Sequence, residues 1–328
     1  MLDAVPGHEV EEALTLRALL RHGGEPTGRH VGDGGSGNAI ATSGERWCND
    51  GRVRIEPVGS LVGRSVVQVL TESPMSTRDP AEARLLAERW GVSILTGWGT
   101  SPDDAVAAAH AIFGADVREA PSPSEVRIGG DRDRRLPMID HTTPLPAHTD
   151  GFAYGDRYPD YFLLSCAHSS AVGGESFLVD GEAVVDELAA RRGGRDLVAR
   201  LQTVPVDQTE PDMQRSVSPI IGRTAAGRLM LRRFPFQRPA EDSAEPERDA
   251  AMIDAWKDAV AEAAARAPRF KLRAGDVAVV DNYRMMHGRE GYADLDRQMW
   301  RVWIWTTAAW GVPDGRLHSD SCYATSEH

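Results

Sequence analysis

The sequence predicts an α+β protein whose β-sandwich or jelly-roll core is buttressed by helices. Three observations lead to this fold class: helical patterns near the start of the chain, many short strand-like segments at irregular spacing after about residue 144, and one long helical insertion. With 41% hydrophobic and 26% charged residues, the 328-residue chain can bury a sizeable core and does not have the composition of a disordered protein.

Apolar periodicity and capping residues predict the helices. Asp79 and Ser101 each precede a proline, which is the arrangement of a helix N-cap followed by proline at the first helical position. The expected helices cover residues 8–21, 79–89, 101–113, 182–191 and 245–266.

Short β-like segments bounded by Gly and Pro predict the strands. The expected strands cover residues 92–95, 161–167, 175–179, 228–232, 276–281 and 300–306. We therefore expect two parts. Residues 1–75, a helix plus a Gly-rich loop, form an N-terminal extension packed on the core, and residues 76–328 form a jelly-roll domain with a helical insertion around 182–266.

Charge and cysteine content narrow the function. The chain carries 37 Lys and Arg against 49 Asp and Glu, a net charge of −12, so it lacks the basic footprint of a nucleic-acid-binding protein. No apolar stretch is long enough to span a bilayer and no signal peptide is recognisable, so we expect no membrane partner. Three isolated cysteines without a CxxC pair fit a reducing compartment. These observations predict a cytoplasmic enzyme that acts on a small molecule.

The sharpest chemical signal is the sequence His148-Thr149-Asp150. In an extended segment, side chains two residues apart point to the same side, so this imidazole and this carboxylate can reach one ion. Together they supply two of the three ligands of the facial triad that holds Fe(II) with open positions. Taken alone, the pattern also fits a surface histidine followed by a turn aspartate.

A third ligand is expected from a distant histidine. His287 follows the strong strand pattern 276–281, and we expect it at the start of a loop just past the end of that strand, where functional residues tend to cluster. The sequence therefore predicts a metal site made of His148, Asp150 and His287.

Two arginines lie in an aromatic-rich strand pattern near the end of the chain. Arg297 and Arg301 are four residues apart, so on a strand they share a face. An arginine that points into an apolar barrel is costly unless an anion meets it, and a planar guanidinium pairs best with a carboxylate. This pattern predicts a dicarboxylate cosubstrate; the alternative is surface pairing with Asp294 or Asp296.

As an ordered set, these motifs resemble the TauD/TfdA family of Fe(II)- and 2-oxoglutarate-dependent dioxygenases. The resemblance covers roughly residues 80–306 and includes HTD, the turn GGESFLVDG, the segment GDVAVVDNYRMMHGRE and the arginine pair. Within the family, the motifs look most like the γ-butyrobetaine hydroxylase branch and the amino-acid hydroxylases related to clavaminate synthase. The resemblance implies a double-stranded β-helix (jelly-roll) core, with Fe(II) as the metal and with 2-oxoglutarate and O2 as cosubstrates.

The resemblance also implies roles for single residues. The three predicted metal ligands would hold the iron, and Arg297 and Ser176 would bind the distal carboxylate of 2-oxoglutarate. Arg301 would face an anionic group of the primary substrate, unless it exchanges roles with Arg297.

Four further residues are candidates for contacting the primary substrate. Phe152 and Tyr154 would line its pocket, with core packing as the alternative. Arg232 and Arg233 would bind its anionic group, with a solvated arginine pair as the alternative.

The expected activity is hydroxylation of an unactivated C–H bond of a small polar, carboxylate-bearing metabolite, such as an amino acid or a natural-product intermediate, with release of succinate and CO2. Desaturation or cyclisation with the same cofactors is one alternative, and a non-redox metal-binding β-barrel protein is another. Two departures from the resemblance limit it: residues 1–75 contain a single cysteine, unlike the zinc module of the γ-butyrobetaine hydroxylases, and HxD replaces the HxE of the clavaminate synthase relatives. Relatives are often dimeric or tetrameric, so a homo-oligomer is one option.

Overall fold

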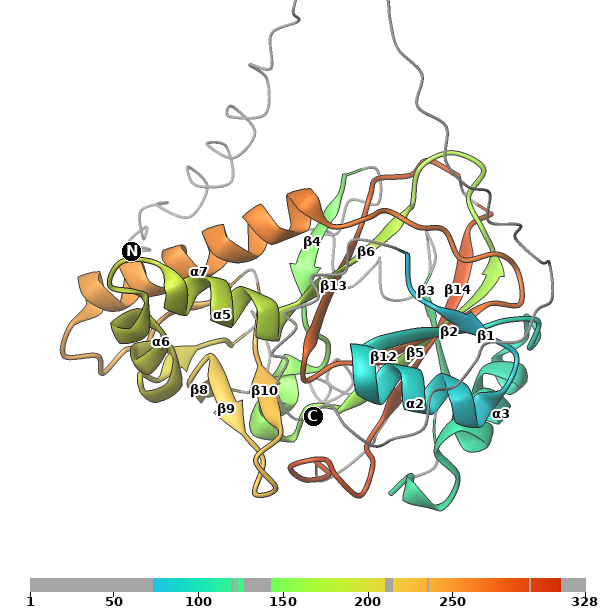
Figure 1. The fold of residues 1–328 in the computed structure, drawn as a ribbon, viewed down its shortest axis with the longest axis horizontal. Coiled ribbons are helices and arrows are strands. Elements are labelled where there is room, and N and C mark those ends of the chain that lie inside the picture. Colours follow the sequence, from blue (N-terminus) through green and yellow to red (C-terminus); the bar gives the residue numbers. More distant parts are fainter. Residues whose placement is uncertain are drawn as a thin grey trace, which may run out of the picture. The chain divides into compact units, whose positions relative to one another are not determined.

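The computed structural model describes residues 73–118, 121, 123–126, 143–209, 215–234, 236–294 and 296–313. All of them belong to the second of the two units into which the chain divides, Gly63–His328. Within this unit two sheets enclose an apolar core, and helices cover the outer face of each sheet (Figure 1). This confirms the predicted jelly-roll core with buttressing helices. The predicted extension over residues 1–75 lies outside the described residues, apart from 73–75.

The larger sheet has six strands and is antiparallel except for one edge pair. Its central strands are apolar runs that are buried on both faces, as expected for strands between a helical layer and a second sheet. In spatial order the strands are β1 (Ser76–Thr77), β2 (Val92–Leu95), β12 (Val277–Asp281), β5 (Tyr161–His168), β14 (Gln298–Ile304) and β3 (Pro123–Val126).

The smaller sheet carries the residues of most interest. Its three antiparallel strands, in spatial order, are β4 (Leu145–His148), β13 (Met285–Arg289) and β6 (Ser176–Asp180). The chain passes from β12 to β13 through residues 282–284, so this short turn connects the two sheets directly.

Four helices match the sequence prediction to within one or two residues at each end. A fifth, over Gly194–Thr203, was not predicted, and the helix predicted over residues 8–21 lies outside the described residues. Asp79 caps α2 by accepting a hydrogen bond from the backbone N–H of Ala81 at 2.9 Å. Ser101 caps α3 in a reciprocal capping box with Asp104, since each side chain accepts a hydrogen bond from the other residue's backbone N–H. The α-helices of the described residues are α2 (Pro80–Trp90), α3 (Pro102–Phe113), α5 (Gly181–Ala190), α6 (Gly194–Thr203) and α7 (Pro246–Arg266).

The insertion between β6 and β12 differs from the prediction. It contains α5, α6 and α7, but it also contains two small antiparallel sheets, so it is not purely helical. Their strands are two or three residues long. One of them was expected, as residues 228–232, and the other four are too short to leave a periodic pattern in the sequence. These strands of the two small sheets are β7 (Val206–Asp207), β8 (Val217–Ser218), β9 (Ile221–Arg223), β10 (Leu229–Leu231) and β11 (Arg238–Pro239).

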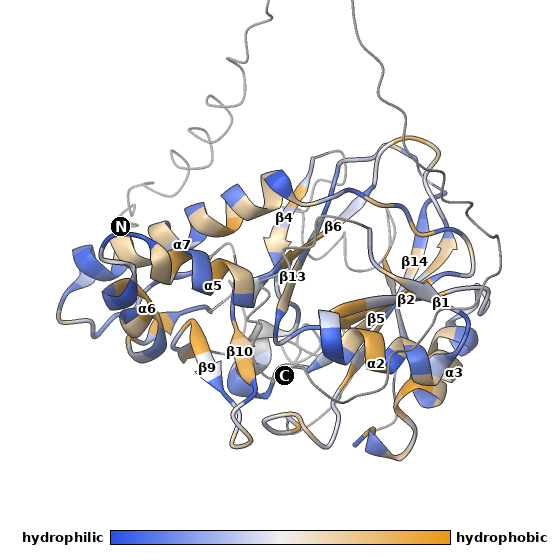
Figure 2. Ribbon diagram, in the orientation of Figure 1, coloured by the Kyte–Doolittle hydropathy of each residue, from blue (hydrophilic) through white to orange (hydrophobic). Residues whose placement is uncertain are grey.

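Side-chain alternation divides the core into layers. In β6, Leu178 points between the two sheets, whereas its neighbours Phe177 and Val179 pack outward against α5 and α7. In β13, Met286 points outward toward the helices and Met285 points inward toward the second sheet. His287 is two residues after Met285, so it lies on the same inward face of the strand. Both α2 and α7 show mixed hydrophobic and hydrophilic faces (Figure 2), as expected for helices that cover a sheet from the solvent side.

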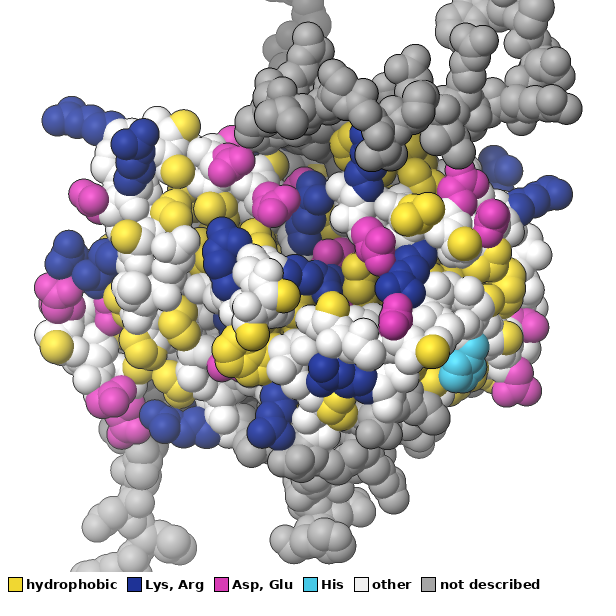
Figure 3. Space-filling view, turned by 60° about the horizontal axis from the view of Figure 1, so that its bottom comes forward, with side chains coloured by type: hydrophobic (Ala, Val, Ile, Leu, Met, Phe, Trp, Pro, Cys, Tyr) yellow, Lys and Arg dark blue, Asp and Glu magenta, His cyan; other side chains and the backbone are white. Residues whose placement is uncertain are grey.

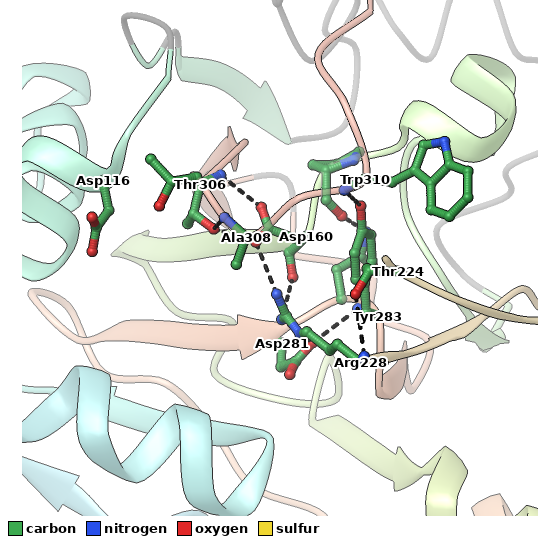
Figure 4. Close-up of polar contacts among 12 residues, drawn as sticks. Asp116, Asp160, Thr224, Arg228, Asp281, Tyr283, Thr306, Ala308 and Trp310 are labelled. Atoms are coloured by element: carbon green, nitrogen blue, oxygen red, sulfur yellow. Dashed lines mark hydrogen bonds and ion pairs between the residues drawn. The ribbon is translucent and has the colours of Figure 1, made fainter. Parts of the chain in front are cut away.

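A buried ion-pair network ties β5, β10 and β12 together (Figure 4). Arg228 bridges the carboxylates of Asp160 at 2.9 Å and Asp281 at 2.8 Å, and its guanidinium stacks on two tyrosine rings. The Thr306 backbone N–H donates to Asp160 at 2.8 Å and the Thr306 hydroxyl donates at 2.5 Å. Each of these charges is therefore paired where it is buried.

The surface carries both signs of charge. On the face shown in Figure 3, Lys and Arg side chains gather across the middle among scattered acidic groups, although the net charge of the chain is −12. Among the described residues, no helix is long and apolar enough to cross a membrane.

Candidate metal centre

The smaller sheet brings two of the predicted ligands together by strand register. His287 in β13 pairs directly with His148 at the end of β4. The prediction that His287 follows the end of a strand at the start of a loop was wrong: it lies in the middle of β13. The turn that follows β12 is only three residues long, so the chain re-enters a sheet before it reaches His287.

Asp150 completes a compact cluster. Its Oδ1 lies 3.6 Å from Nε2 of His148 and 3.9 Å from Nε2 of His287. One ligand atom from each residue lies within 4.8 Å of the others, an arrangement that could hold a metal ion. The Asp150 side chain is 3% exposed, so this carboxylate is sheltered from bulk water.

A backbone carbonyl sets the tautomer of His148. Nδ1 of His148 lies 2.9 Å from the carbonyl oxygen of Pro146, and because a carbonyl can only accept, Nδ1 must carry the proton. The lone pair of a neutral imidazole is then on Nε2, the atom that faces Asp150.

Two donors hold the Asp150 carboxylate. The indole N–H of Trp303 donates to Oδ2 at 2.9 Å, and Nη1 of Arg301 lies 3.2 Å from the same oxygen. Burial by itself would raise the pKa of Asp150, but the positive charge of Arg301 opposes it, and this pKa lies well below its usual range. The carboxyl group is therefore ionised and its orientation is fixed.

The backbone of Asp150 is held as firmly as its side chain. The side-chain oxygen of Asn282 accepts the Asp150 N–H at 2.9 Å, while its amide group donates to the carbonyls of Asp150 at 3.0 Å and Pro159 at 2.8 Å. Sequence analysis singled out neither Asn282 nor Trp303. Signals for both were present, since Asn282 directly follows a buried strand and Trp303 shares the strand face of Arg301.

A cavity of about 990 Å³, including its open mouth, lies between the sheets. Its lining includes both histidines of the cluster together with Ser176, Arg297 and Arg301. The structure therefore brings the predicted cosubstrate residues and the two histidines to one cavity.

Arg297 enters this cavity without a protein anion. It is 3% exposed, its guanidinium lies 4.5 Å from the centre of the Tyr292 ring, and its Nε and Nη1 are buried with no hydrogen-bond partner among the described residues. The alternative of surface pairing with Asp294 or Asp296 is wrong for this side chain: only its backbone N–H bonds to Asp294, at the carbonyl oxygen. A buried cation in this state needs an external anion.

The Gly173-Gly174 turn allows this approach. Both glycines have a positive φ near +70°, and a Cβ on Gly173 would lie 2.2 Å from the carbonyl oxygen of Gly291. A Cβ on Gly174 would lie 3.2 Å from Nε of Arg297, so the turn packs closely on that arginine. Ser176, at the start of β6, lies two residues after Gly174.

Two aromatic residues, Phe152 and Tyr154, were the other candidates for the substrate pocket. Tyr154 lies in a short 3₁₀ segment, η2 (Phe152–Arg157), and packs edge-on against Trp303 and Trp305 at centroid distances of 5.9 and 5.7 Å. Tyr154 packs against the core and is absent from the lining of the cavity, so core packing, the alternative, describes this residue. The side chain of Phe152 lies outside the described residues.

A family model described as taurine catabolism dioxygenase TauD, TfdA family, matches residues 54–303, which is most of the chain. The chain belongs to the TauD/TfdA family. This TauD/TfdA protein is accordingly a dioxygenase that uses Fe(II) and 2-oxoglutarate, which excludes the alternative of a non-redox metal-binding protein. The donor set fits that metal, since two imidazoles and one carboxylate form the facial triad of such enzymes, and the buried unpaired Arg297 fits a dicarboxylate cosubstrate.

Two solved structures share the fold of this TauD/TfdA protein. A taurine dioxygenase from Burkholderia xenovorans is 21% identical with a TM-score of 0.52, and the match covers 72% of this chain and 84% of that one. An asparagine oxygenase is 19% identical with a TM-score of 0.52, covering 70% of this chain and 78% of that one. The branch within the family stays a prediction.

Proposed function

We propose that this dioxygenase hydroxylates a C–H bond of a small carboxylate-bearing metabolite such as an amino acid, with His148, Asp150 and His287 as its iron ligands. The observation that carries the proposal is one cavity lined by both histidines and by the buried, unpaired Arg297. The substrate class is supported by the names of the two structural relatives, because taurine and asparagine each bear an amino group and an acid group.

In this proposal the cosubstrate is bound through its two ends. Arg297 and Ser176 hold the distal carboxylate of 2-oxoglutarate, which orients its keto acid toward the histidines of the same cavity. A planar guanidinium suits a carboxylate because two parallel N–H donors match its two oxygens.

The protein's own contribution is positioning and exclusion of water. Pro146 keeps Nε2 of His148 ready as a ligand, and Trp303 and Arg301 keep Asp150 ionised and oriented. The cavity walls include apolar side chains such as Phe162, Leu164 and Val280. When bound, iron and 2-oxoglutarate supply, with O2, the oxidising power for the C–H bond, and 2-oxoglutarate leaves as succinate and CO2.

The first test is the pair His287→Ala and His110→Ala. His110 is an exposed residue of α3 and serves as the matched control. We expect the wild-type protein and His110→Ala to develop the visible charge-transfer absorption of an Fe(II)·2-oxoglutarate complex without O2, and to release succinate when O2 is admitted. His287→Ala should lose both while its thermal unfolding stays cooperative. A wild-type protein that shows neither signal would refute the iron-site proposal.

The second test identifies the reaction outcome. Amino acids and charged metabolites are screened for succinate release above the level without a primary substrate, and products are analysed by mass spectrometry. Hydroxylation adds one oxygen atom, whereas desaturation or cyclisation removes two hydrogens. Products that gain oxygen support the proposal, and products that only lose hydrogen replace it with one of these alternatives.

A further inference from the structure

Tyr292 lies beside the predicted cosubstrate residues, although sequence analysis did not single it out. It is 6% exposed and lines the cavity that also holds Ser176 and Arg297. Its backbone forms an antiparallel bridge with Gly173, and a Cβ on Gly174 would lie 3.4 Å from the Cβ of Tyr292. The side chain is therefore held at one wall of the cavity, against the glycine turn that packs on Arg297.

The ring of Tyr292 meets the guanidinium group of Arg297. The central carbon of that group lies 4.5 Å from the centre of the ring, within the range of a cation–π contact. Such a contact holds a guanidinium group in place but uses none of its N–H donors, because the attraction comes from the electron density of the ring face. Nε and Nη1 of Arg297 accordingly have no hydrogen-bond partner among the described residues. A protein carboxylate in place of the ring would occupy these donors.

Two other buried arginines have a protein acid. Arg301, the candidate for an anionic group of the primary substrate, contacts the Asp150 carboxylate at 3.2 Å, and that role stays a prediction. Arg232 is 4% exposed and pairs with Asp156, so the alternative of a solvated arginine pair was wrong for this residue. Both also lie over aromatic rings, so the acid is what distinguishes them from Arg297.

A second guanidinium group lies over the same ring. Its central carbon, in Arg289, is 4.8 Å from the ring centre, and Nη1 of Arg289 donates to the carbonyl oxygens of Thr143 at 3.1 Å and Glu290 at 3.3 Å. These bonds hold Arg289 without any ligand. The ring therefore attracts two cations that repel each other. Without the ring, the guanidinium of Arg297 would lose an attractive surface and keep a repulsive neighbour, so we expect it to leave its present orientation.

We propose that Tyr292 positions Arg297 for the distal carboxylate of 2-oxoglutarate. The ring keeps the guanidinium at the cavity wall with its donors unpaired, so that less side-chain freedom is lost when the cosubstrate binds. Tyr292 acts through Arg297 and makes no bond to the cosubstrate itself. The proposal rests on the proposed function, because it takes Arg297 as the partner of that carboxylate.

The test compares Tyr292→Leu with Tyr292→Phe, the matched control that keeps the ring and removes only the hydroxyl group. Titration of the charge-transfer absorption with Fe(II) and without O2 gives the Kd of 2-oxoglutarate. We expect this Kd to rise about 10-fold in Tyr292→Leu, the size of a desolvated cation–π contact, and to change by less than about twofold in Tyr292→Phe. An equal rise in both variants, or no rise in Tyr292→Leu, overturns the proposal.

A second ligand separates the positioning of Arg297 from general damage to the site. 2-Oxopentanoate has the chain length and the keto acid of 2-oxoglutarate, but a methyl group replaces the distal carboxylate. Its Kd should be the same in the wild type and in Tyr292→Leu, since it presents no anion to Arg297. A rise as large as that for 2-oxoglutarate would show that the substitution disturbs the whole cavity and would contradict the proposed role.

A double-mutant cycle asks whether the ring acts through Arg297. In an Arg297→Met protein, adding Tyr292→Leu should not raise the Kd of 2-oxoglutarate further, because the group that the ring positions is already missing. A further rise of about 10-fold, the full effect of the single substitution, would mean that the ring acts independently of Arg297.

Folding of the variants is checked by thermal unfolding. Tyr292→Met is measured beside Tyr292→Leu, since a flexible methionine side chain fills an irregular gap in a core. If neither variant unfolds cooperatively, the ring is required by the fold and the positioning role is rejected.

Glutarate tests the same contact without iron. It keeps two carboxylates five carbons apart in one chain but lacks the keto group, and calorimetry with the metal-free protein gives its Kd. If the wild-type protein gives no charge-transfer absorption, the proposed function fails and glutarate decides the role of the ring: weaker binding to Tyr292→Leu than to Tyr292→Phe supports it, and equal or absent binding overturns it. If the absorption is present and all variants bind 2-oxoglutarate equally, only the role of Tyr292 fails.

Discussion

The molecule contains two groups of arginine and aspartate side chains, one around Arg228 and one at the metal centre. Around Arg228, every charge has a partner, and a threonine satisfies the remaining oxygens of Asp160 (Figure 4). Around the metal centre, Asp150 is held from several sides, but Arg297 has buried N–H groups without a partner among the described residues. Asn282, which follows Asp281 directly, holds the backbone of Asp150.

This difference distinguishes a charge network that stabilises the fold from a site that binds a ligand. A network that only stabilises the fold pairs all its groups, because an unpaired buried charge lowers stability. A binding site keeps donors unpaired until its ligand arrives, and the fold tolerates that cost. Four predictions test this contrast, from the largest expected effect to the smallest.

Arg228→Met should have the largest effect on stability. It leaves Asp160 and Asp281 buried without a cation, and breaking such a pair costs about 3–5 kcal/mol. Urea unfolding measures the loss, with Arg223→Met as the control for removal of an exposed charge. A loss below about 1 kcal/mol, the level of a surface ion pair, would mean that the network is not structural.

Arg297→Met should weaken ligand binding without lowering stability, the opposite of Arg228→Met. The affinity for 2-oxoglutarate should fall by about 2–5 kcal/mol, since one member of a buried charge pair is missing in the complex. Stability without ligand should not fall, because the substitution removes an uncompensated charge. Titration of the charge-transfer absorption gives the Kd, and thermal unfolding gives the stability. Weaker binding that is accompanied by a comparable loss of stability would contradict the contrast.

Trp303→Phe should have an effect of intermediate size, on the affinity for iron. It keeps an aromatic ring but removes the N–H that orients Asp150, and loss of such a partner typically weakens metal binding by about 10- to 100-fold. Trp305→Phe is the matched control, since its indole N–H donates to the carbonyl oxygen of Arg157 and not to Asp150. Competition with a coloured chelator measures iron affinity, and equal affinities in the two variants would count against the positioning role of Trp303.

The titration of the Cys166 thiol should have the smallest effect on stability. This buried thiol lies between the sheets, and burial raises its pKa to about 11. Between the ordinary thiol pKa and 11, the folded protein keeps the proton of this thiol while the unfolded chain loses it. The free energy of unfolding therefore falls as the pH rises through this range. Peptide mapping after iodoacetamide treatment at pH 8 should show Cys166 labelled only after unfolding in urea. Rapid labelling of the native protein would place the thiol at the surface.

Local sequence patterns were enough for most of the elements and for the ligand set. Proline after Asp79 and Ser101 marked two helix starts, because capping depends on neighbours in the chain. Of the two- and three-residue strands of the insertion, β10 was predicted as residues 228–232, whereas β7, β8, β9 and β11 were missed, since their pairing is set by distant partners and not by an internal period. His287 was identified as a candidate ligand but misplaced, because its cross-strand pairing with His148 depends on a turn between two sheets.

By itself, the sequence determined the chemistry of the donors: two histidines, one aspartate and several arginines in an order that resembles one enzyme family. Tertiary structure alone decided which arginine has a partner. In sequence, Arg228, Arg232, Arg233, Arg297 and Arg301 are all arginines near predicted strands. Their roles differ because the energy of a charge depends on burial and on the distance to the nearest opposite charge, and the acids that pair with three of them lie in other segments of the chain.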